Sequence, residues 1–275
     1  MSSNPKVSLI ISFYNRVDFF LPVIASIANQ SFKDFEIVIS DDGSAADAVN
    51  TVTDILTKSG LNFQYVWHED IGFRKNIILN KSVMAGRGEY LVFIDADCML
   101  HRHFLSEHYN GRMAGVIRSG SRIDLSDKLT KRINFEKVNA GSLGLRLLFD
   151  QLVDIENRGY RGIEEGIYLG NTIFKYFLSR KDNRILGCNF GMFKADLVRL
   201  NGFDERFCKP GIGEDTDLEH RARRASLAIQ SISKRAIEFH LYHPQLARER
   251  EVYDIFEENN RLKVTVTPYG ITKFA

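Results

Sequence analysis

The chain has 275 residues, enough for one large α/β domain or two small ones, and its 44% hydrophobic and 26% charged residues are ordinary for a globular protein. A formal net charge of +2 argues against nucleic-acid binding, which usually takes a strong basic excess. Three widely spaced cysteines, Cys98, Cys188 and Cys208, suggest a reducing compartment and neither a disulfide framework nor a zinc site.

The N-terminal residues MSSNPK lead straight into an expected strand, without a visible signal peptide. No apolar run approaches the roughly 20 residues that a membrane span needs. We therefore expect a cytoplasmic protein. Peripheral docking on the inner face of the plasma membrane stays an open alternative.

Short apolar segments alternate with segments of helical periodicity over the first hundred residues. We expect strands at Val7–Ser12, Glu36–Ser40, Asn62–Trp67 and Tyr90–Ile94, and helices at Phe19–Ile27, Val49–Leu56 and Phe73–Ala85. Strands that alternate with helices in this way indicate βαβ units and a mostly parallel sheet of Rossmann type.

Three of these strands end in polar residues, at Ser12 to Asn15, Asp41 to Ser44 and Asp95 to Asp97. The carboxyl ends of parallel strands share one edge of a sheet, where ligands bind. The last pair of carboxylates would suit a divalent cation and a phosphate ligand. The alternative is a set of plain turns, because Asp-Gly is a common turn dipeptide and an Asp often caps a turn. No Gly-x-Gly-x-x-Gly or Walker lysine motif occurs.

The helix expected after His68 begins with Gly72, Arg74 and Lys75, and a cation there could face a diphosphate. An ordinary solvated helix start explains the charges equally well. Residues 105–185 are less informative. We expect a strand at Ala114–Ser119, helices at Leu143–Val153 and Ile173–Leu178, and nearby basic residues that either are solvated or meet acidic lipid headgroups.

The C-terminal third carries a second concentration of polar residues. Ile185–Gly202 indicates a strand, a glycine-flanked turn and a short helix, and the acidic residues of Glu214–Glu219 open another helix. The helix dipole favours acidic residues there, but four carboxylates exceed what capping requires, and one would suit general-base work. A strand in Ala236–Pro244 ends at His240 and His243, either of which could be structural. A charged helix, Gln245–Arg261, and an edge strand, Lys263–Thr267, are expected to follow.

Together these segments resemble family 2 glycosyltransferases of the GT-A fold over about residues 5–245. The resemblance rests on VSLIISFYNR, SFKDFEIVISDDGS, EDIGFRKNIILN, FIDADC, GCNFGMFKADLVRLNGFDE, GIGEDTDLEHR and HLYHP. The last three look like the subgroup whose C-terminal half is similar to galactosyltransferases and bacterial chondroitin-type polymerases. The resemblance implies one domain, residues 1–245, and a C-terminal helix and tail, residues 246–275. Within the domain it implies a nucleotide-binding half (1–104), a helical, variable insertion (105–185) and an acceptor and catalytic half (186–245).

The resemblance also implies roles for individual residues. Contacts to the nucleotide would come from Ser12, Tyr14, Asn15, Asp41, Asp42, Arg74 and Asp95. The cation, Mn²⁺ or less favourably Mg²⁺, would be held by Asp97 and a late histidine, His240 first and His243 second, with Asp95 at the ribose or the metal. Asp215 would be the catalytic base, Glu214 would hold the acceptor or donor sugar, and Asn189 and Gly213 would border the sugars. Ile212 stands where galactosyltransferases carry a Trp, which leaves the identity of both sugars open.

The implied reaction is an inverting transfer of a hexose or N-acetylhexosamine from a UDP-sugar to a hydroxyl of a saccharide or lipid-linked glycan, in bacterial surface polysaccharide synthesis. One alternative is a sugar-1-phosphate nucleotidylyltransferase, which normally has a glycine-rich N-terminal loop, whereas Val7–Arg16 contains no glycine. Another is a non-catalytic nucleotide-sugar-binding module. The presence of Asp97, Asp215 and His240 together argues against that module.

Overall fold

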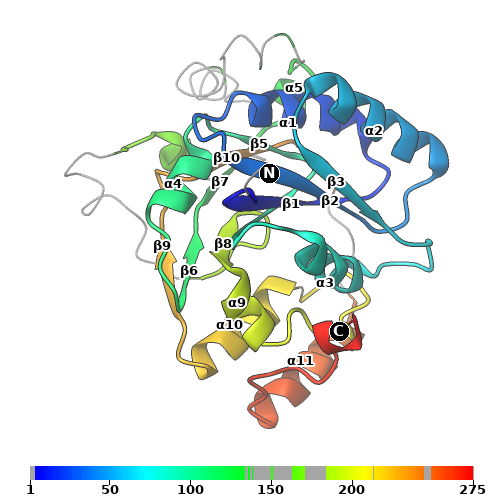
Figure 1. Ribbon diagram of the computed structural model, residues 1–275, viewed down its shortest axis with the longest axis vertical. Helices are drawn as coiled ribbons and strands as arrows, with labels where there is room; N and C mark the ends of the chain where they lie inside the picture. Colours follow the sequence, from blue (N-terminus) through cyan, green and yellow to red (C-terminus); the bar gives the residue numbers. More distant parts are fainter. Residues whose placement is uncertain are drawn as a thin grey trace.

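The computed structural model describes residues 4–133, 163–170, 184–212, 214–244 and 249–274, and the single positions 136, 138 and 150 (Figure 1). The main sheet of the described residues contains β1 (Val7–Phe13), β2 (Phe35–Asp41), β3 (Phe63–Trp67), β4 (Tyr90–Asp95), β6 (Val116–Ser119), β8 (Phe190–Phe193) and β9 (Ala228–Ser231). Their order is β3-β2-β1-β4-β8-β6-β9. Strands β3, β2, β1 and β4 are mutually parallel, and β8 runs antiparallel to both β4 and β6. The predicted α/β class with a mixed, mostly parallel sheet is confirmed.

The central strands are apolar throughout because both faces of the sheet are covered. In β1, Leu9 and Ile11 pack into one hydrophobic cluster, whereas Ile10 packs into a second cluster on the opposite face. In β4, Val92 joins the first cluster and Phe93 the second. This alternation follows from the two-residue period of a strand, and it explains why the sequence shows a continuous apolar run instead of an amphipathic pattern.

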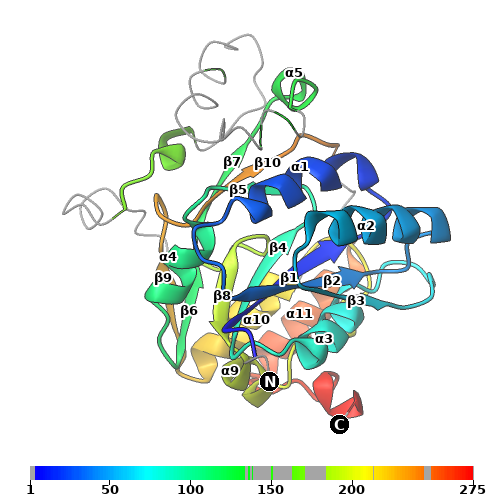
Figure 2. The ribbon, with the colours of Figure 1, turned by 45° about the horizontal axis from the view of Figure 1, so that its top comes forward.

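The helices divide between these two faces (Figures 1 and 2). Helices α1 (Val17–Ala28) and α2 (Ala46–Ser59) contribute to the first cluster. The second cluster receives side chains from α3 (Lys75–Ala85), α9 (Lys194–Arg199) and α10 (Glu214–Arg224). Helix α11 (Glu251–Arg261) lies on this second side, next to the C-terminal residues (Figure 1). No helix among the described residues combines the length and apolarity needed to cross a bilayer.

A second, three-stranded sheet completes the edge of the domain. It consists of β5 (Cys98–Leu100), β10 (Ile237–His240) and β7 (Ser121–Asp124), in the order β5-β10-β7. Only Ala96 and Asp97 separate the end of β4 from the start of β5. Since β10 pairs antiparallel with β5, with His240 opposite Cys98, a residue from near the end of the chain lies beside the end of β4.

Three expected elements differ from the structure. The strand expected from Ile185 begins at Phe190, because the backbone N–H groups of the preceding residues bond to side chains instead of a strand. The C-terminal helix begins at Glu251, later than expected. The edge strand expected at Lys263–Thr267 is absent from these described residues, since Lys263 adopts a left-handed φ of 52° that breaks an extended segment. The helices expected at 143–153 and 173–178 lie outside the described residues, apart from position 150.

Candidate active site

A carboxylate and two imidazoles meet at the carboxyl edge of the main sheet. Asp97 Oδ2 lies 2.9 Å from His243 Nε2 and 3.5 Å from His240 Nε2. One ligand atom from each residue falls within 4.8 Å of the others, and all three side chains are partly exposed. The short link between β4 and β5 places Asp97, the end of β10 places His240, and the segment after β10 places His243. The fold therefore builds a group with the spacing of metal ligands from two segments far apart in the sequence.

The electrostatics of this group favour a charged carboxylate. Burial alone would raise the pKa of Asp97, but hydrogen bonds and charge interactions with His240 and His243 hold that pKa well below its usual value. The hydrogen bond to Asp97 raises the pKa of His243. Burial lowers the pKa of His240, yet the contact with Asp97 raises it by more. On its other side, His240 Nδ1 lies 3.5 Å from Asp124 Oδ1, an arrangement that often orients a metal-binding imidazole.

A lysine joins the end of β4 to the start of α10. Lys75 Nζ donates to Asp95 Oδ1 at 2.9 Å and to Glu214 Oε1 at 2.7 Å. Burial lowers the pKa of Lys75, but the two carboxylates outweigh it and hold the pKa well above its usual value. The bridge fixes the first turn of α10 against the sheet edge that carries Asp97.

Asp215 follows Glu214 and faces the segment that leads into β8. Its Oδ2 accepts a hydrogen bond from the Gly187 N–H at 3.2 Å, and its Oδ1 accepts one from the Thr216 N–H at 2.6 Å. A Cβ on Gly187 would lie only 3.0 Å from oxygens of both Asp215 and Glu214, so a larger residue there would push these carboxylates by a few tenths of an ångström. Gly187 in turn precedes Cys188, which lies next to Cys98, the neighbour of Asp97. The neighbours of Asp97 and Asp215 along the chain, Asp95 and Glu214, meet at the same lysine, Lys75.

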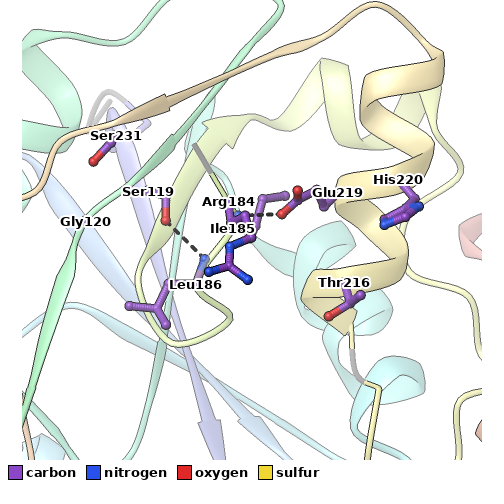
Figure 3. Close-up of a pocket in the computed structure, with 9 residues that line it drawn as sticks. All are labelled: Ser119, Gly120, Arg184, Ile185, Leu186, Thr216, Glu219, His220 and Ser231. Atoms are coloured by element: carbon purple, nitrogen blue, oxygen red, sulfur yellow. Dashed lines mark hydrogen bonds between the residues drawn. The ribbon is translucent and has the colours of Figure 1, made fainter. Parts of the chain in front are cut away.

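A cavity of about 400 Å³ opens beside α10 (Figure 3). Segment 184–186 forms one wall, and Thr216, Glu219 and His220 of α10 form another. The Ile185 N–H donates to Glu219 Oε2 at 2.8 Å, and the Leu186 N–H donates to Ser119 Oγ at 3.0 Å. These bonds hold the segment between β6 and α10. The cavity adjoins Asp215, because Thr216 follows it and Leu186 precedes its partner Gly187.

The predicted nucleotide-side aspartates are held by neighbouring loops. Asp42 Oδ1 lies 2.7 Å from His68 Nε2, and Oδ2 accepts the Arg74 N–H at 2.9 Å. Burial raises the pKa of Asp42 and lowers the pKa of His68. Asp41 is fully buried, and it accepts hydrogen bonds from the Ser44 N–H and the Tyr65 hydroxyl. Asp41 therefore shapes the loop, whereas Asp42 has a partly solvated carboxylate nearer the surface.

The residues after β1 form the exposed side of the same region. The Tyr14 hydroxyl donates to Asp70 Oδ2 at 2.9 Å, and its ring remains 49% exposed. Asn15, at a left-handed φ of 54°, accepts the Ala45 N–H through Oδ1. Ser12 is partly exposed and lies opposite both Ser40 and Asp95 in the parallel ladder. The guanidinium of Arg74 donates to the Glu69 carbonyl.

The structure corrects or leaves open three sequence-based assignments. Asn189 has a structural role: it is fully buried, its amide donates to the Ser121 and Ala236 carbonyls, and its Oδ1 faces His108, so its side chain is not open to a sugar in this structure. Asp95 falls outside the metal-ligand group found among the described residues, because its carboxylate binds Lys75. Gly213 lies outside the described residues, so its assignment stays a prediction. The roles of the remaining residues also stay predictions.

Several side chains at this site were not singled out from the sequence. His68 and Tyr65 orient the two nucleotide-side aspartates, and Asp124 orients His240. His68 stood at the start of a segment that the sequence did mark, whereas no local signal marks Asp124. Its part in the site depends on the pairing of β7 with β10, which only the fold reveals.

Comparison with solved structures defines the class of the fold. A mannosyltransferase from Pyrobaculum calidifontis, solved with GDP-Man and Mn²⁺, superposes with a TM-score of 0.56 at 16% identity, over 95% of this chain and 63% of that one. The Staphylococcus aureus TarS fragment 1–349, solved with UDP-GlcNAc, gives a TM-score of 0.57 at 18% identity, over 94% of this chain and 65% of that one. The fold is thus that of the GT-A glycosyltransferases.

Two family models match the sequence. Residues 8–111 match the family model for glycosyl transferase family 2, and residues 170–244 match the model described as the N-terminal domain of galactosyltransferase. The match over residues 8–111 agrees with the resemblance to family 2 glycosyltransferases that the motifs indicate.

Curated relatives include the chondroitin synthase of Escherichia coli, which is 26% identical over 260 residues, covering 89% of this chain and 36% of that protein. The GalNAc(5)-diNAcBac-PP-undecaprenol beta-1,3-glucosyltransferase of Campylobacter jejuni is 34% identical over 93 residues, covering 34% of this chain and 30% of that protein. The chain thus spans about a third of the length of these relatives.

Proposed function

We propose that this glycosyltransferase moves a hexose or N-acetylhexosamine from a UDP-sugar to a hydroxyl of a saccharide or lipid-linked glycan, with inversion at the anomeric carbon. The observation that carries the proposal is the group of Asp97, His240 and His243 at the sheet edge, with Asp215 in the helix turn that Lys75 joins to this edge. The neighbour that holds UDP-GlcNAc and the relatives that build glycans support the choice of donor and acceptor.

We assign donor binding to the carboxyl ends of β1 and β2. The Asp42 carboxylate would accept a hydrogen bond from the imide N–H of uracil, since each carboxylate oxygen can accept more than one bond. The exposed Tyr14 ring would stack on the base. Asp41 and Ser44 would act indirectly, by fixing the loop that presents Asp42.

The Asp97 group fits a divalent cation, because one carboxylate and two imidazoles converge at a partly exposed position. Mixed oxygen and nitrogen ligands favour Mn²⁺ over Mg²⁺, which prefers oxygen. When bound, such a cation supplies positive charge against the developing charge of the leaving diphosphate. The orientation of His240 would come from Asp124, and Asp97 would enter the site already ionised.

We assign the base to Asp215 and the acceptor to the adjoining cavity. The Gly187 N–H holds the Asp215 carboxylate in place, so that it can take the proton of the acceptor hydroxyl as that oxygen attacks. The bond from Lys75 leaves the Glu214 carboxylate neutralised beside it. A single displacement from the face opposite the leaving group inverts the anomeric carbon and needs no covalent intermediate.

We further propose a role in bacterial surface polysaccharide or lipid-linked oligosaccharide assembly, in the cytoplasm or at the inner face of the plasma membrane. The glycan-building relatives support this role. Cell fractionation with an antibody to the chain would test the location. A chain found only in the culture medium would contradict it.

The experiment that tests the function is a screen for UDP release. The chain is incubated with a panel of UDP-sugars and with chondroitin-type oligosaccharide or lipid-linked acceptors, with and without Mn²⁺. We expect acceptor-dependent release of UDP with at least one donor, and a β-linked product from an α-linked donor by NMR. Pyrophosphate release from UTP and a sugar 1-phosphate would instead support a nucleotidylyltransferase. Binding of UDP-sugars without turnover on the whole panel would support a binding module.

A further inference from the structure

Two cysteines and a glutamate meet in the core directly behind Asp97. Cys98 opens β5, Glu238 lies on the neighbouring strand β10, and Cys188 lies just before β8. One ligand atom from each falls within 4.8 Å of the others. Cys98 and Glu238 are 0% exposed, and Cys188 is 3% exposed. The spacing of the cysteines along the chain gave no sign of this contact, because it arises from strand pairing.

The charges of this thiol cluster are poorly satisfied by the protein alone. Neither carboxylate oxygen of Glu238 has a hydrogen-bond partner among the described residues. Among the described residues, the cation recorded against the cluster is Arg122, whose Nη1 lies 3.6 Å from Cys188 Sγ and whose Nε pairs with Asp124 at 2.9 Å. A buried carboxyl without a hydrogen-bond partner is kept neutral by its proton, and a cation that replaced this proton would give both oxygens a partner.

Asp97 connects the thiol cluster to the imidazole group. Its Oδ2 faces His243 and His240, whereas its Oδ1 lies 3.3 Å from Cys98 Sγ. The carboxylate therefore separates two sets of ligands of different chemistry. The set on the exposed side offers imidazole nitrogens, and the set on the buried side offers sulfur.

We propose that Cys98, Cys188 and Glu238 form a second cation site, suited to a thiophilic divalent ion of the Zn²⁺ class. Two thiolates and a carboxylate are ligands that Zn²⁺ takes, and Zn²⁺ usually has four ligands. Asp97 Oδ1, 3.3 Å from Cys98 Sγ, is placed to supply the fourth. Binding releases the protons of the two thiols and of the buried Glu238 carboxyl. The divalent ion and Arg122 then balance the charge of these three ligands, and Asp97 adds a fourth negative charge.

The test is a titration of the full chain with Cd²⁺ in a phosphine reductant, because a Cd²⁺–thiolate bond absorbs in the ultraviolet. We expect one equivalent of Cd²⁺ to produce this absorption, and Zn²⁺ to displace it. Cys188→Ser should abolish most of the absorption and weaken binding by at least about 10–100-fold, the cost of removing only an outer-shell partner at a metal site. Glu238→Gln should weaken binding while the absorption persists at saturation.

Cys208→Ser is the matched control, because Cys208 is a free, partly buried cysteine outside the cluster. It should titrate like the unmodified chain. A cooperative thermal unfolding transition shows that each variant is folded. The Cys188→Ser and Glu238→Gln variants are sufficient to test the site, so no variant of the fully buried Cys98 is needed. Equal Cd²⁺ absorption in Cys188→Ser, or its loss in Cys208→Ser, would overturn the proposal. So would the absence of any thiolate absorption in the folded, unmodified chain.

Occupancy of the thiol site should oppose cation binding on the other side of Asp97, a consequence that rests on the proposed function. Saturating Cd²⁺ is therefore expected to lower Mn²⁺-supported UDP affinity in the unmodified chain and in Cys208→Ser by more than in Cys188→Ser. Equal losses in all three would refute this coupling through Asp97. The thiolate absorption tests the thiol site without any nucleotide present. Failure of the thiol-site proposal is therefore distinguishable from failure of the proposed Mn²⁺-supported donor binding.

Discussion

The two halves of the candidate site are assembled in different ways. On the nucleotide side, Asp41 and Asp42 are held by Ser44, Tyr65, His68 and Arg74, all within the first βαβ units. On the transfer side, Asp97 meets residues from near the end of the chain, and Lys75 bonds to Glu214 across 139 positions. The nucleotide region is thus built locally, whereas the region assigned to transfer exists only when the C-terminal third is docked.

Because of this difference, substitutions in the two halves are expected to have different effects. A variant on the nucleotide side should change recognition and leave the rest of the fold intact. A variant in the long-range contacts should alter catalysis, stability or both. The following changes test that division, from the largest expected effect to the smallest.

Replacing the proposed base should have the largest effect. Asp215→Asn keeps the shape of the side chain but cannot accept a proton, so transfer should fall by about 10²–10⁴-fold. UDP affinity should stay within a few-fold, because the nucleotide side does not depend on Asp215. Initial rates of UDP release, with UDP binding measured on the same preparation, check both expectations. Turnover near that of the unmodified chain would remove Asp215 from the mechanism.

Removing the lysine bridge should lower stability. Lys75→Met leaves the carboxylates of Asp95 and Glu214 facing each other without a cation. The free energy of unfolding is expected to fall by about 3 kcal/mol, the loss typical of a broken buried ion pair. Urea unfolding measures it. Lys58→Met is the control, since its pair with Asp54 is solvent-exposed and contributes at most about 1 kcal/mol. Equal losses in both variants would show that the bridge does not hold α10.

A buried histidine behind the transfer side should make stability depend on pH. Burial lowers the pKa of His108 to about 3, from 6.5 in the unfolded chain. The stability that the neutral ring contributes is therefore present above pH 6.5 and lost as the pH falls toward 3. Between pH 7 and pH 5 the loss is about 2 kcal/mol.

His108→Gln removes the titrating group and keeps a donor for Asn189. Its unfolding free energy should fall less over this pH range, by about that amount. The comparison uses urea unfolding of both chains at the two pH values. Parallel losses in the two chains would exclude His108 as a source of the acid sensitivity.

Replacing Asn189 tests whether this side chain stabilises the fold or binds a sugar. Asn189→Ala removes the side-chain donor to the Ser121 carbonyl and one of the two donors to the Ala236 carbonyl, which keeps the Ser121 N–H, and should cost about 1–3 kcal/mol of stability. The KM for the donor should be unchanged in the folded fraction, because the side chain is fully buried. A raised KM with unchanged stability would restore the sequence-based assignment to the sugar.

The sequence predicts the strands of the first hundred residues well because its information there is local. The apolar runs of β1, β2 and β4, and the polar residues that follow them, need only strand periodicity and the rule that parallel strands end at one edge. The long-range contacts are harder. The start of β8 was misplaced because residues 185–187 bond to the side chains of Glu219, Ser119 and Asp215. The same limit hid the meeting of Cys98 with Cys188, and made Asn189 look like a site residue.

The late histidines show where resemblance adds to local reasoning. Periodicity gives a strand that ends near His240 but no partner for it, and the family pattern supplied Asp97. The structure brings both His240 and His243 to Asp97, whereas the sequence ranked one above the other.

The central claim is that Asp97 and its two histidines hold the cation that supports donor binding. Calorimetric titration of UDP, with and without Mn²⁺, tests it on the unmodified chain, on Asp97→Ala and on the surface control Asp54→Ala. We expect Mn²⁺ to strengthen UDP binding in the unmodified chain and the control but not in Asp97→Ala, whose metal-free affinity should stay within a few-fold. The same Mn²⁺-supported affinity in Asp97→Ala as in the unmodified chain would contradict the claim.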